Sequence, residues 1–144
     1  TYDPAGRLAS QTDQLGNTTA YTYTAHGQIA EAAVKAKDGD TVSTTAYTYD
    51  EGTGLLLSSA VTDASGATTV RQTEYDGLNR VTGVWEGARD DADAKKNTLI
   101  TYAYDSEGRL VSVAYPDGKA VSRAYDQHGQ LETATDAAGA VTAY

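Results

Sequence analysis

Two histidines are the first residues of this sequence that could do chemistry. An imidazole can act as a general acid or base near neutral pH, and His26 and His128 are the only two in the chain. Each stands directly before a glycine, in a short motif whose other copies hold Ala5 or Glu107 at the same place. A position that accepts alanine, glutamate and histidine in one chain has no catalytic requirement. Both histidines are therefore predicted to be turn residues.

Clustered carboxylates could bind calcium, because this ion needs several hard oxygen ligands that converge on one point. Aspartates gather only at Asp38 with Asp40 and at Asp90, Asp91 and Asp93, and neither group has the spacing of an EF-hand loop. The sequence also lacks a phosphate-binding loop, a zinc-ligand spacing and a nucleophile elbow. We expect no catalytic residue, no metal and no cofactor, so the chain is predicted not to be an enzyme.

The aspartates belong to a motif that recurs along the chain. The heptapeptide Tyr-Asp-Pro-Ala-Gly-Arg-Leu at 2–8 returns closely at 104–110 and, with glutamine for arginine, at 125–131. Looser copies begin at 23, 49 and 75, and the copy at 49 carries one inserted residue. Such periodicity indicates a repeat fold. Residues 1–144 are interpreted as one array of about six copies that start near 2, 23, 49, 75, 104 and 125.

The residue types of the motif predict a hairpin turn in each copy. Aspartate can accept hydrogen bonds from backbone amides two residues on, and glycine tolerates the positive φ that reverses a chain. Asn79 stands in for this glycine in the fourth copy. A second turn signal lies between the motifs, at 13–16, 38–40, 63–66, 116–118 and 136–139. Two turns in each repeat give two strands in each repeat.

The segments between the turns have the pattern of half-buried strands. Tyr21 and Tyr23 alternate with threonines, as do Tyr47 and Tyr49, which places each tyrosine pair on one face. Threonine, valine and tyrosine favour pleated strands. The predicted fold class is all β, with tandem antiparallel hairpins in a continuous sheet.

Residues 28–37 and 87–97 do not show this alternation of tyrosine with threonine. Residues 28–37 are rich in helix formers, but ten residues are few for an isolated helix and the repeat places them between two turns. We predict a strand there. Residues 87–97 are polar and lie where the interval between copies is longest, so they are predicted to form a protruding loop.

Composition and charge exclude some classes of protein. Eleven Lys and Arg against twenty Asp and Glu leave a net charge of −9, which would repel nucleic acid phosphates. No apolar run is long enough to span a membrane. The chain has eleven Tyr, one Trp and neither Phe nor Cys. Because phenylalanine is absent, tyrosine must supply the aromatic packing. Because cysteine is absent, the sequence does not indicate whether the protein works in an oxidising or a reducing compartment.

The tandem motif resembles the YD repeat of Rhs proteins, toxin-complex C components, cell-wall-associated polymorphic toxins and teneurins, and the resemblance covers essentially the whole chain. It implies that the motif residues serve the fold and no chemical step. Departures from the family pattern are Thr24 in place of Asp, and Gln28 and Gln130 in place of Arg. The matching positions are Tyr2, Asp3, Gly6, Arg7, Leu8, Tyr23, Gly27, Tyr49, Asp50, Tyr75, Asp76, Arg80, Tyr104, Asp105, Gly108, Arg109, Leu110, Tyr125, Asp126, Gly129 and Leu131.

In that family the hairpins wind into a spiral sheet that closes as a hollow shell, and bacterial members hold a toxic C-terminal domain inside. The resemblance implies a structural shell segment that shields such a toxin during secreted delivery between competing bacteria. Expected partners are neighbouring repeats, the enclosed toxin domain and components of the secretion machinery, and the expected place is outside the cell or at its surface. An acidic lining could steady a basic cargo. The first and last motif positions suggest an excerpt of a longer array.

A cell-surface binding module is the alternative interpretation. Aromatic side chains on a sheet can stack on sugars as well as on each other. The proposed ligand face is an exposed row of tyrosines with Trp85, which stands beside the predicted 87–97 loop. In the first interpretation the same tyrosines form cross-strand contacts, each worth about 0.2–1 kcal/mol.

Overall fold

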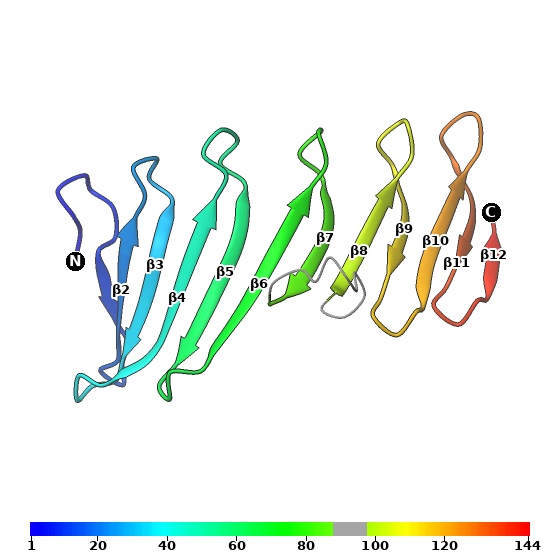
Figure 1. Ribbon diagram of the computed structural model, residues 1–144. Coiled ribbons are helices and arrows are strands. Elements are labelled where there is room, and N and C mark those ends of the chain that lie inside the picture. The colour runs from blue at the N-terminus through cyan, green and yellow to red at the C-terminus, as the bar shows by residue number, and fades with distance from the viewer. Residues whose placement is uncertain (88–97) are drawn as a thin grey trace. The chain divides into compact units, whose positions relative to one another are not determined.

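The computed structural model describes residues 1–87 and 98–144 and contains only strands and turns there. The strands are β1 (Ser10–Thr12), β2 (Thr18–Tyr23), β3 (Ile29–Lys35), β4 (Thr41–Tyr49), β5 (Leu56–Asp63), β6 (Thr68–Tyr75), β7 (Val81–Glu86), β8 (Thr98–Tyr104), β9 (Leu110–Ala114), β10 (Ala120–Tyr125), β11 (Leu131–Thr135) and β12 (Val141–Ala143). Within β1 to β5 and within β7 to β12, each strand is antiparallel to its paired neighbours, and paired strands are consecutive in the sequence (Figure 1). The prediction of an all-β fold built from tandem antiparallel hairpins is confirmed. The described residues include no helix that could cross a membrane.

The chain forms two compact units, Thr1–Arg71 and Gln72–Tyr144. The first unit holds β1 to β5 and the start of β6. The second holds the end of β6 and β7 to β12.

The motif turns are three-residue hairpin loops, except in the third copy, whose loop has one residue more. In the fifth copy the Gly108 amide donates to the Asp105 carbonyl at 3.0 Å, and the Asp105 amide donates to the Arg109 carbonyl at 3.0 Å. Gly108 has a φ of +85°, as a type I turn followed by a left-handed residue requires. Asn79 takes the same role with a φ of +63° and is the only non-glycine residue with positive φ in the described part of the chain. This confirms the prediction that Asn79 replaces glycine.

The segment that is rich in helix formers is a strand, as predicted. β3 pairs with β2 on one side and with β4 on the other, so its backbone hydrogen-bonding groups are satisfied by the ladder. Pairing on both sides outweighs a helix propensity that is worth only tenths of a kcal/mol per residue. Of the predicted loop at 87–97, Gly87 has a φ of +75°, and residues 88–97 lie outside the described residues.

The two faces of each unit carry different side chains. Because directly paired residues share a face, the pairs Tyr21–Ala32 and Tyr47–Ser59 define one face of the first unit. Ala46 with Ala60 lies on the opposite face. That second face carries many small alanine, serine and threonine side chains, together with Glu31, which pairs with Ala46. Cross-strand hydroxyl contacts such as Thr48 Oγ1 to Ser58 Oγ at 2.7 Å lie on it.

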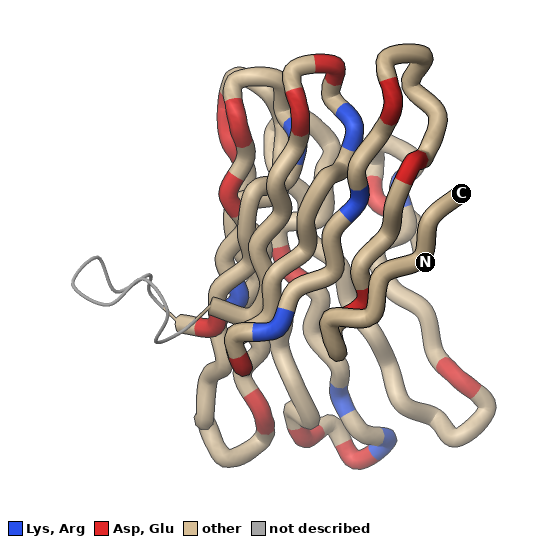
Figure 2. Tube along the Cα trace, turned by 90° about the vertical axis from the view of Figure 1, so that its right-hand side faces the viewer, with Lys and Arg blue, Asp and Glu red and all other residues tan. Residues whose placement is uncertain are grey.

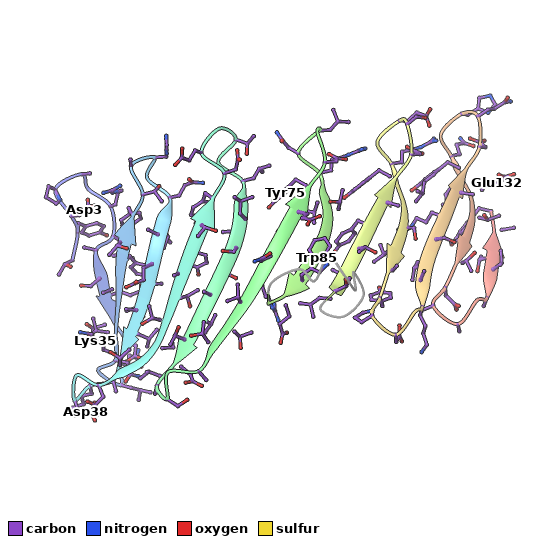
Figure 3. All side chains as sticks on the ribbon, in the orientation of Figure 1. Asp3, Lys35, Asp38, Tyr75, Trp85 and Glu132 are labelled. Atoms are coloured by element: carbon purple, nitrogen blue, oxygen red, sulfur yellow. The ribbon has the colours of Figure 1, made fainter. Side chains whose placement is uncertain are left out.

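The sheet has almost no buried core. Trp85 and Val113, which are 5% and 9% exposed, are the only large apolar side chains classed as buried in the described residues. The indole of Trp85 on β7 folds back over Gly83, two residues earlier on the same strand (Figure 3). A Cβ atom on Gly83 would lie 2.0 Å from the indole Cη2 atom. The sequence therefore needs glycine at position 83 because Trp85 occupies the space of its side chain.

Replacing Gly83 with alanine is expected to displace the indole and to lower the free energy of unfolding by about 1–3 kcal/mol, the usual cost of an overpacked site. Trp85 is the only tryptophan, so its fluorescence emission should move to longer wavelength as the ring becomes exposed. Gly77→Ala is the matched control, because nothing lies within 4 Å of a Cβ atom there and its φ is not positive. Identical emission spectra for the two variants would contradict this packing.

Candidate functional site

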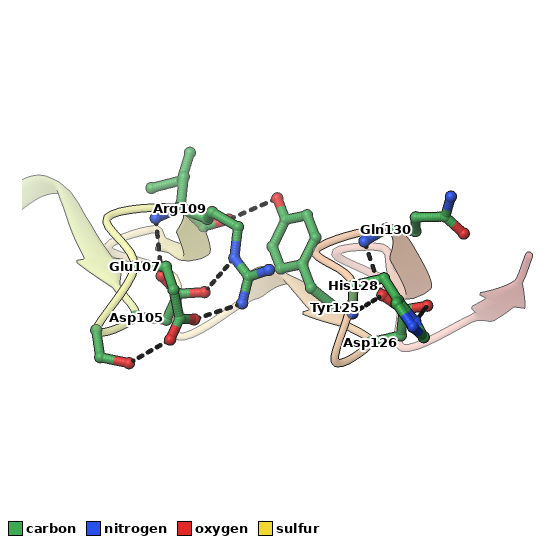
Figure 4. Close-up of polar contacts among 9 residues, drawn as sticks. Asp105, Glu107, Arg109, Tyr125, Asp126, His128 and Gln130 are labelled. Atoms are coloured by element: carbon green, nitrogen blue, oxygen red, sulfur yellow. Dashed lines mark hydrogen bonds and ion pairs between the residues drawn. The ribbon is translucent and has the colours of Figure 1, made fainter.

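The motif folds into an ion-paired turn. In the fifth copy, Asp105 Oδ1 accepts a hydrogen bond from the Arg109 amide at 2.8 Å, and Asp105 Oδ2 accepts one from Arg109 Nε at 2.7 Å (Figure 4). The same two bonds recur between Asp3 and Arg7 and between Asp76 and Arg80. One carboxylate thus binds the backbone of the turn and also fixes the direction of the guanidinium group.

Each of these guanidinium groups lies over the lead tyrosine of the next copy. Arg109 Cζ is 4.5 Å from the centre of the Tyr125 ring, within the range of a cation–π contact. Arg7 over Tyr23 and Arg80 over Tyr104 have the same geometry, at 4.4 Å each. The motif arginine therefore connects two successive hairpins.

The hydroxyl group of the same tyrosine returns to the hairpin that supplies the arginine. Tyr23 Oη donates to the Leu8 carbonyl at 2.7 Å, and Tyr104 Oη donates to the Val81 carbonyl at 3.0 Å. Tyr125 Oη reaches the Leu110 carbonyl at 3.4 Å (Figure 4). We call the Asp and Arg of one copy, the Tyr of the next copy and this carbonyl group a clasp. The three clasps are Asp3–Arg7–Tyr23, Asp76–Arg80–Tyr104 and Asp105–Arg109–Tyr125.

The clasps favour ionised carboxylates. The side-chain hydrogen bond from Arg80, followed by the bond from its amide, holds the pKa of Asp76 below its ordinary value of 3.8. In the first clasp the amide of Arg7 is the largest cause of the lowered pKa of Asp3. Desolvation acts to raise the pKa of Asp105, but the bonds from Arg109 outweigh it, and the pKa is lowered overall.

The second and third copies have no clasp arginine, and the sequence holds no arginine between Arg7 and Arg71. Gln28 replaces it in the second copy, where Gln28 Nε2 donates to the Gly54 carbonyl at 2.7 Å. Tyr49 Oη still donates to the Ile29 carbonyl at 2.9 Å. The link to the next hairpin is therefore kept at this junction, but it is uncharged.

Sequence reasoning named the motif arginines and tyrosines but did not find that they meet. The arginine precedes its tyrosine by 23 − 7 = 16 residues in the first clasp and by 104 − 80 = 24 residues in the second. Because the insertions between copies change this spacing, no fixed interval indicates the pair. The available signal was that both residue types belong to every well-formed copy of the motif.

The histidines, the acidic residues and Trp85 of the described part do not gather into one site. His26 and His128 are exposed at separate turns, as predicted, and His128 Nδ1 lies 3.5 Å from Asp126 Oδ2. Residues 1–87 and 98–144 contain no cluster of three or more acidic or histidine side chains that could hold a metal ion. Trp85 is 5% exposed, so its indole offers no open face for stacking a sugar.

The sequence matches the family model described as RHS Repeat over residues 2–42, 92–120 and 104–141, which together cover more than half of the chain. The chain belongs to the RHS Repeat family. The resemblance of its motif to Rhs and YD repeats is thereby confirmed, and the chain is a structural segment built from RHS repeats. No curated protein sequence gives a significant match.

Solved structures of toxin-complex proteins resemble the RHS repeats of this chain. The crystal structure of TcdB2-TccC3 is 18% identical with a TM-score of 0.52, and the match covers 99% of this chain and 10% of that chain. TcdB2-TccC3 without its hypervariable C-terminal region is 18% identical with a TM-score of 0.51, and the match covers 99% of this chain and 9% of that chain. The Photorhabdus luminescens Tc holotoxin pore is 19% identical with a TM-score of 0.49, and the match covers 94% of this chain and 9% of that chain. The first two likenesses show the fold, and the chain spans about a tenth of the length of these proteins.

Removing the hydroxyl group of a clasp tyrosine is expected to weaken the link between two hairpins. Tyr104→Phe keeps the ring under Arg80 but loses the bond to the Val81 carbonyl, which should lower the free energy of unfolding by about 1 kcal/mol. Tyr144→Phe is the control, since Tyr144 is 77% exposed, and it should change stability by less than about 0.5 kcal/mol. Equal losses in urea unfolding would show that the hydroxyl bond does not stabilise the fold.

The lowered aspartate pKa values predict a loss of stability in acid. A carboxylate whose pKa is lower in the folded state stabilises the fold above its unfolded pKa, and this stabilisation is lost as the pH falls through the folded pKa. The free energy of unfolding should stay level above about pH 5 and fall below it. In urea titrations over this range, Asp105→Asn should decline less steeply than the natural chain, whereas Asp117→Asn, outside the clasps, serves as control. An unchanged slope in Asp105→Asn would contradict the assignment.

Proposed function

We propose that this chain is a wall segment of an Rhs-type β-shell that encloses and shields a C-terminal toxin domain during secreted delivery. The observation that carries the proposal is the clasp, which joins the turn of one hairpin to the next hairpin in a sheet with almost no buried core. Because the clasp recurs between successive hairpins, contacts of this kind can extend a single-layer sheet over a large area. Such a sheet suits a barrier better than a catalytic pocket.

The proposed mechanism is exclusion. Neighbouring strands in each unit are joined by antiparallel ladders, and strand spacings of about 4.8 Å leave no room for a protease or a second protein to pass. Paired strands also have no free hydrogen-bonding edge, which limits association with other chains. In this view the partners are neighbouring repeats and the enclosed domain. Delivery would involve the secretion machinery, and the array would be longer than this chain.

The related proteins support this choice. The chain covers about a tenth of each matched toxin-complex protein, as a few repeats of a long array would, and the name of one of these structures refers to a hypervariable C-terminal region. We extend to this chain's parent the idea that such a variable region is the protected cargo. The binding-module alternative is not proposed, because the aromatic face that it needs includes the buried Trp85.

The positions of the acidic residues argue against an acidic lining of the shell. Most acidic residues of the described part lie in or next to turns, toward the ends of the hairpins (Figure 2). The strand faces carry few charges, so we do not propose that the wall holds its cargo through an acidic lining. Enclosure by the sheet itself is the proposed means of retention.

The experiment is to express the complete parent reading frame and to follow its C-terminal fragment. A shielded fragment should be cut from the array, should co-elute with it in size exclusion until denaturant is added, and should resist protease while the array is folded. The same fragment expressed alone is the control and should be digested rapidly. Elution of an uncut parent would overturn the proposal. So would digestion of the C-terminal fragment at the same rate whether it is held in the array or expressed alone.

A further inference from the structure

The groove at the junction between the second and third copies has a different lining from the groove at a clasped junction. Tyr49 occupies the lead position that Tyr23, Tyr104 and Tyr125 occupy elsewhere, but no guanidinium group of residues 1–87 and 98–144 lies over its ring, because the second copy has Gln28 in place of arginine. A groove lies here between the hairpin tips of the first unit, and Tyr47 and Tyr49 line it.

The equivalent groove in the second unit shows what the missing arginine changes. Between the fifth and sixth copies the groove is lined by Arg109 and Glu107, together with the turn from Asp126 to Gly129, while Tyr125 is not among its lining residues. Arg109 lies over that ring at 4.5 Å. Where arginine is absent, the tyrosines themselves form the wall of the groove.

Gln28 replaces only part of an arginine. Arg109 Nη1 would lie 3.1 Å from a Cβ atom on Gly129, and Gln28 Nε2 would lie 3.5 Å from one on Gly54. The glutamine amide therefore reaches the glycine of the next turn, as the arginine does, and it is held there by its bond to the Gly54 carbonyl. It supplies no positive charge to the Tyr49 ring.

The rim of the groove is acidic. Asp50 and Glu51 line it beside the two tyrosines, and His26 lies on the opposite hairpin tip. Asp50 Oδ1 is occupied by the turn, since it accepts bonds from the Gly52 amide and from the amide and hydroxyl of Thr53. Burial, followed by the proximity of Tyr47, raises the pKa of Tyr49.

We propose that this groove binds an arginine side chain of a second polypeptide, with the guanidinium group over Tyr49 and paired with the carboxylate of Asp50 or Glu51. Three sister positions in the same chain hold a guanidinium group over the equivalent ring at 4.4–4.5 Å and pair it with the aspartate of the arginine's own copy. Thr24 stands in that aspartate position at this junction, and the carboxylates that line the groove are instead Asp50 and Glu51. Arginine suits this position better than lysine, because its planar group stacks on aromatic rings and pairs with carboxylates at the same time. The net charge of −9 favours a basic partner.

The test compares two short peptides that differ only in the end group of one side chain, a charged guanidinium in one and a neutral urea in the other. An acetylated Gly-Arg-Gly amide should shift the ring resonances of Tyr47 and Tyr49 in a saturable way in NMR titrations of the chain. The same peptide with citrulline, which has nearly the same shape but no charge, should bind at least threefold more weakly. Equal shifts with both peptides, or no shift with either, would overturn the proposal.

A variant that fills the groove provides the second arm. Thr24→Asp with Gln28→Arg restores the two missing clasp residues, so the chain's own guanidinium group should cover Tyr49 and abolish binding of the arginine peptide. Because this change adds contacts to the fold, loss of binding could not be attributed to unfolding, and the NMR spectrum would verify the fold. Gln130→Arg, at the same repeat position in the sixth copy, is the matched control and should leave binding unchanged. Full binding by the Thr24→Asp, Gln28→Arg variant would also overturn the proposal. These outcomes do not depend on whether the parent protein encloses a toxin.

Discussion

The structure depends on one constraint: a single-layer sheet cannot bury its side chains, so its hairpins must be joined by other means. Only Trp85 and Val113 among the large apolar side chains of the described residues are buried. Backbone ladders join the strands, and the clasps join the hairpin ends, where an aspartate, an arginine and a tyrosine act across two copies of the motif. The motif is therefore best understood as half of a junction that the next copy completes.

This view explains which departures from the motif the fold tolerates. Asn79 can replace glycine because asparagine adopts positive φ more readily than most residues. Gln28 can replace arginine because a neutral amide still reaches the next turn. The third copy accepts an extra residue because the turn closes through Gly54, whose amide donates to the Asp50 carbonyl at 2.8 Å. Each change keeps the turn or the connection to the next hairpin, and the change at Gln28 also removes the positive charge from the junction at Tyr49.

Membership of the RHS Repeat family and the shared fold of the toxin-complex proteins agree with a structural role. A wall built in this way has its reactive-looking residues in structural positions. Asp105 and Arg109 are ionised partners of each other and of the backbone, and they stabilise a turn. Their strong electrostatic coupling would suggest a catalytic site if the repeat were overlooked. The groove at Tyr49 is the exception, since no guanidinium group of the described residues lies over its ring.

The sequence alone determined the repeat, the turns and the all-β fold, because these depend on local rules. Aspartate and glycine fix the turns, and the alternation of tyrosine with threonine fixes the faces. The strand at 29–35 was also within reach, since the repeat register outweighed local helix propensity. Only the tertiary structure revealed that Arg80 lies over Tyr104, or that Trp85 is buried over Gly83. Both contacts depend on where separate segments or rotamers come to lie in space, and neither residue spacing nor composition carries that information.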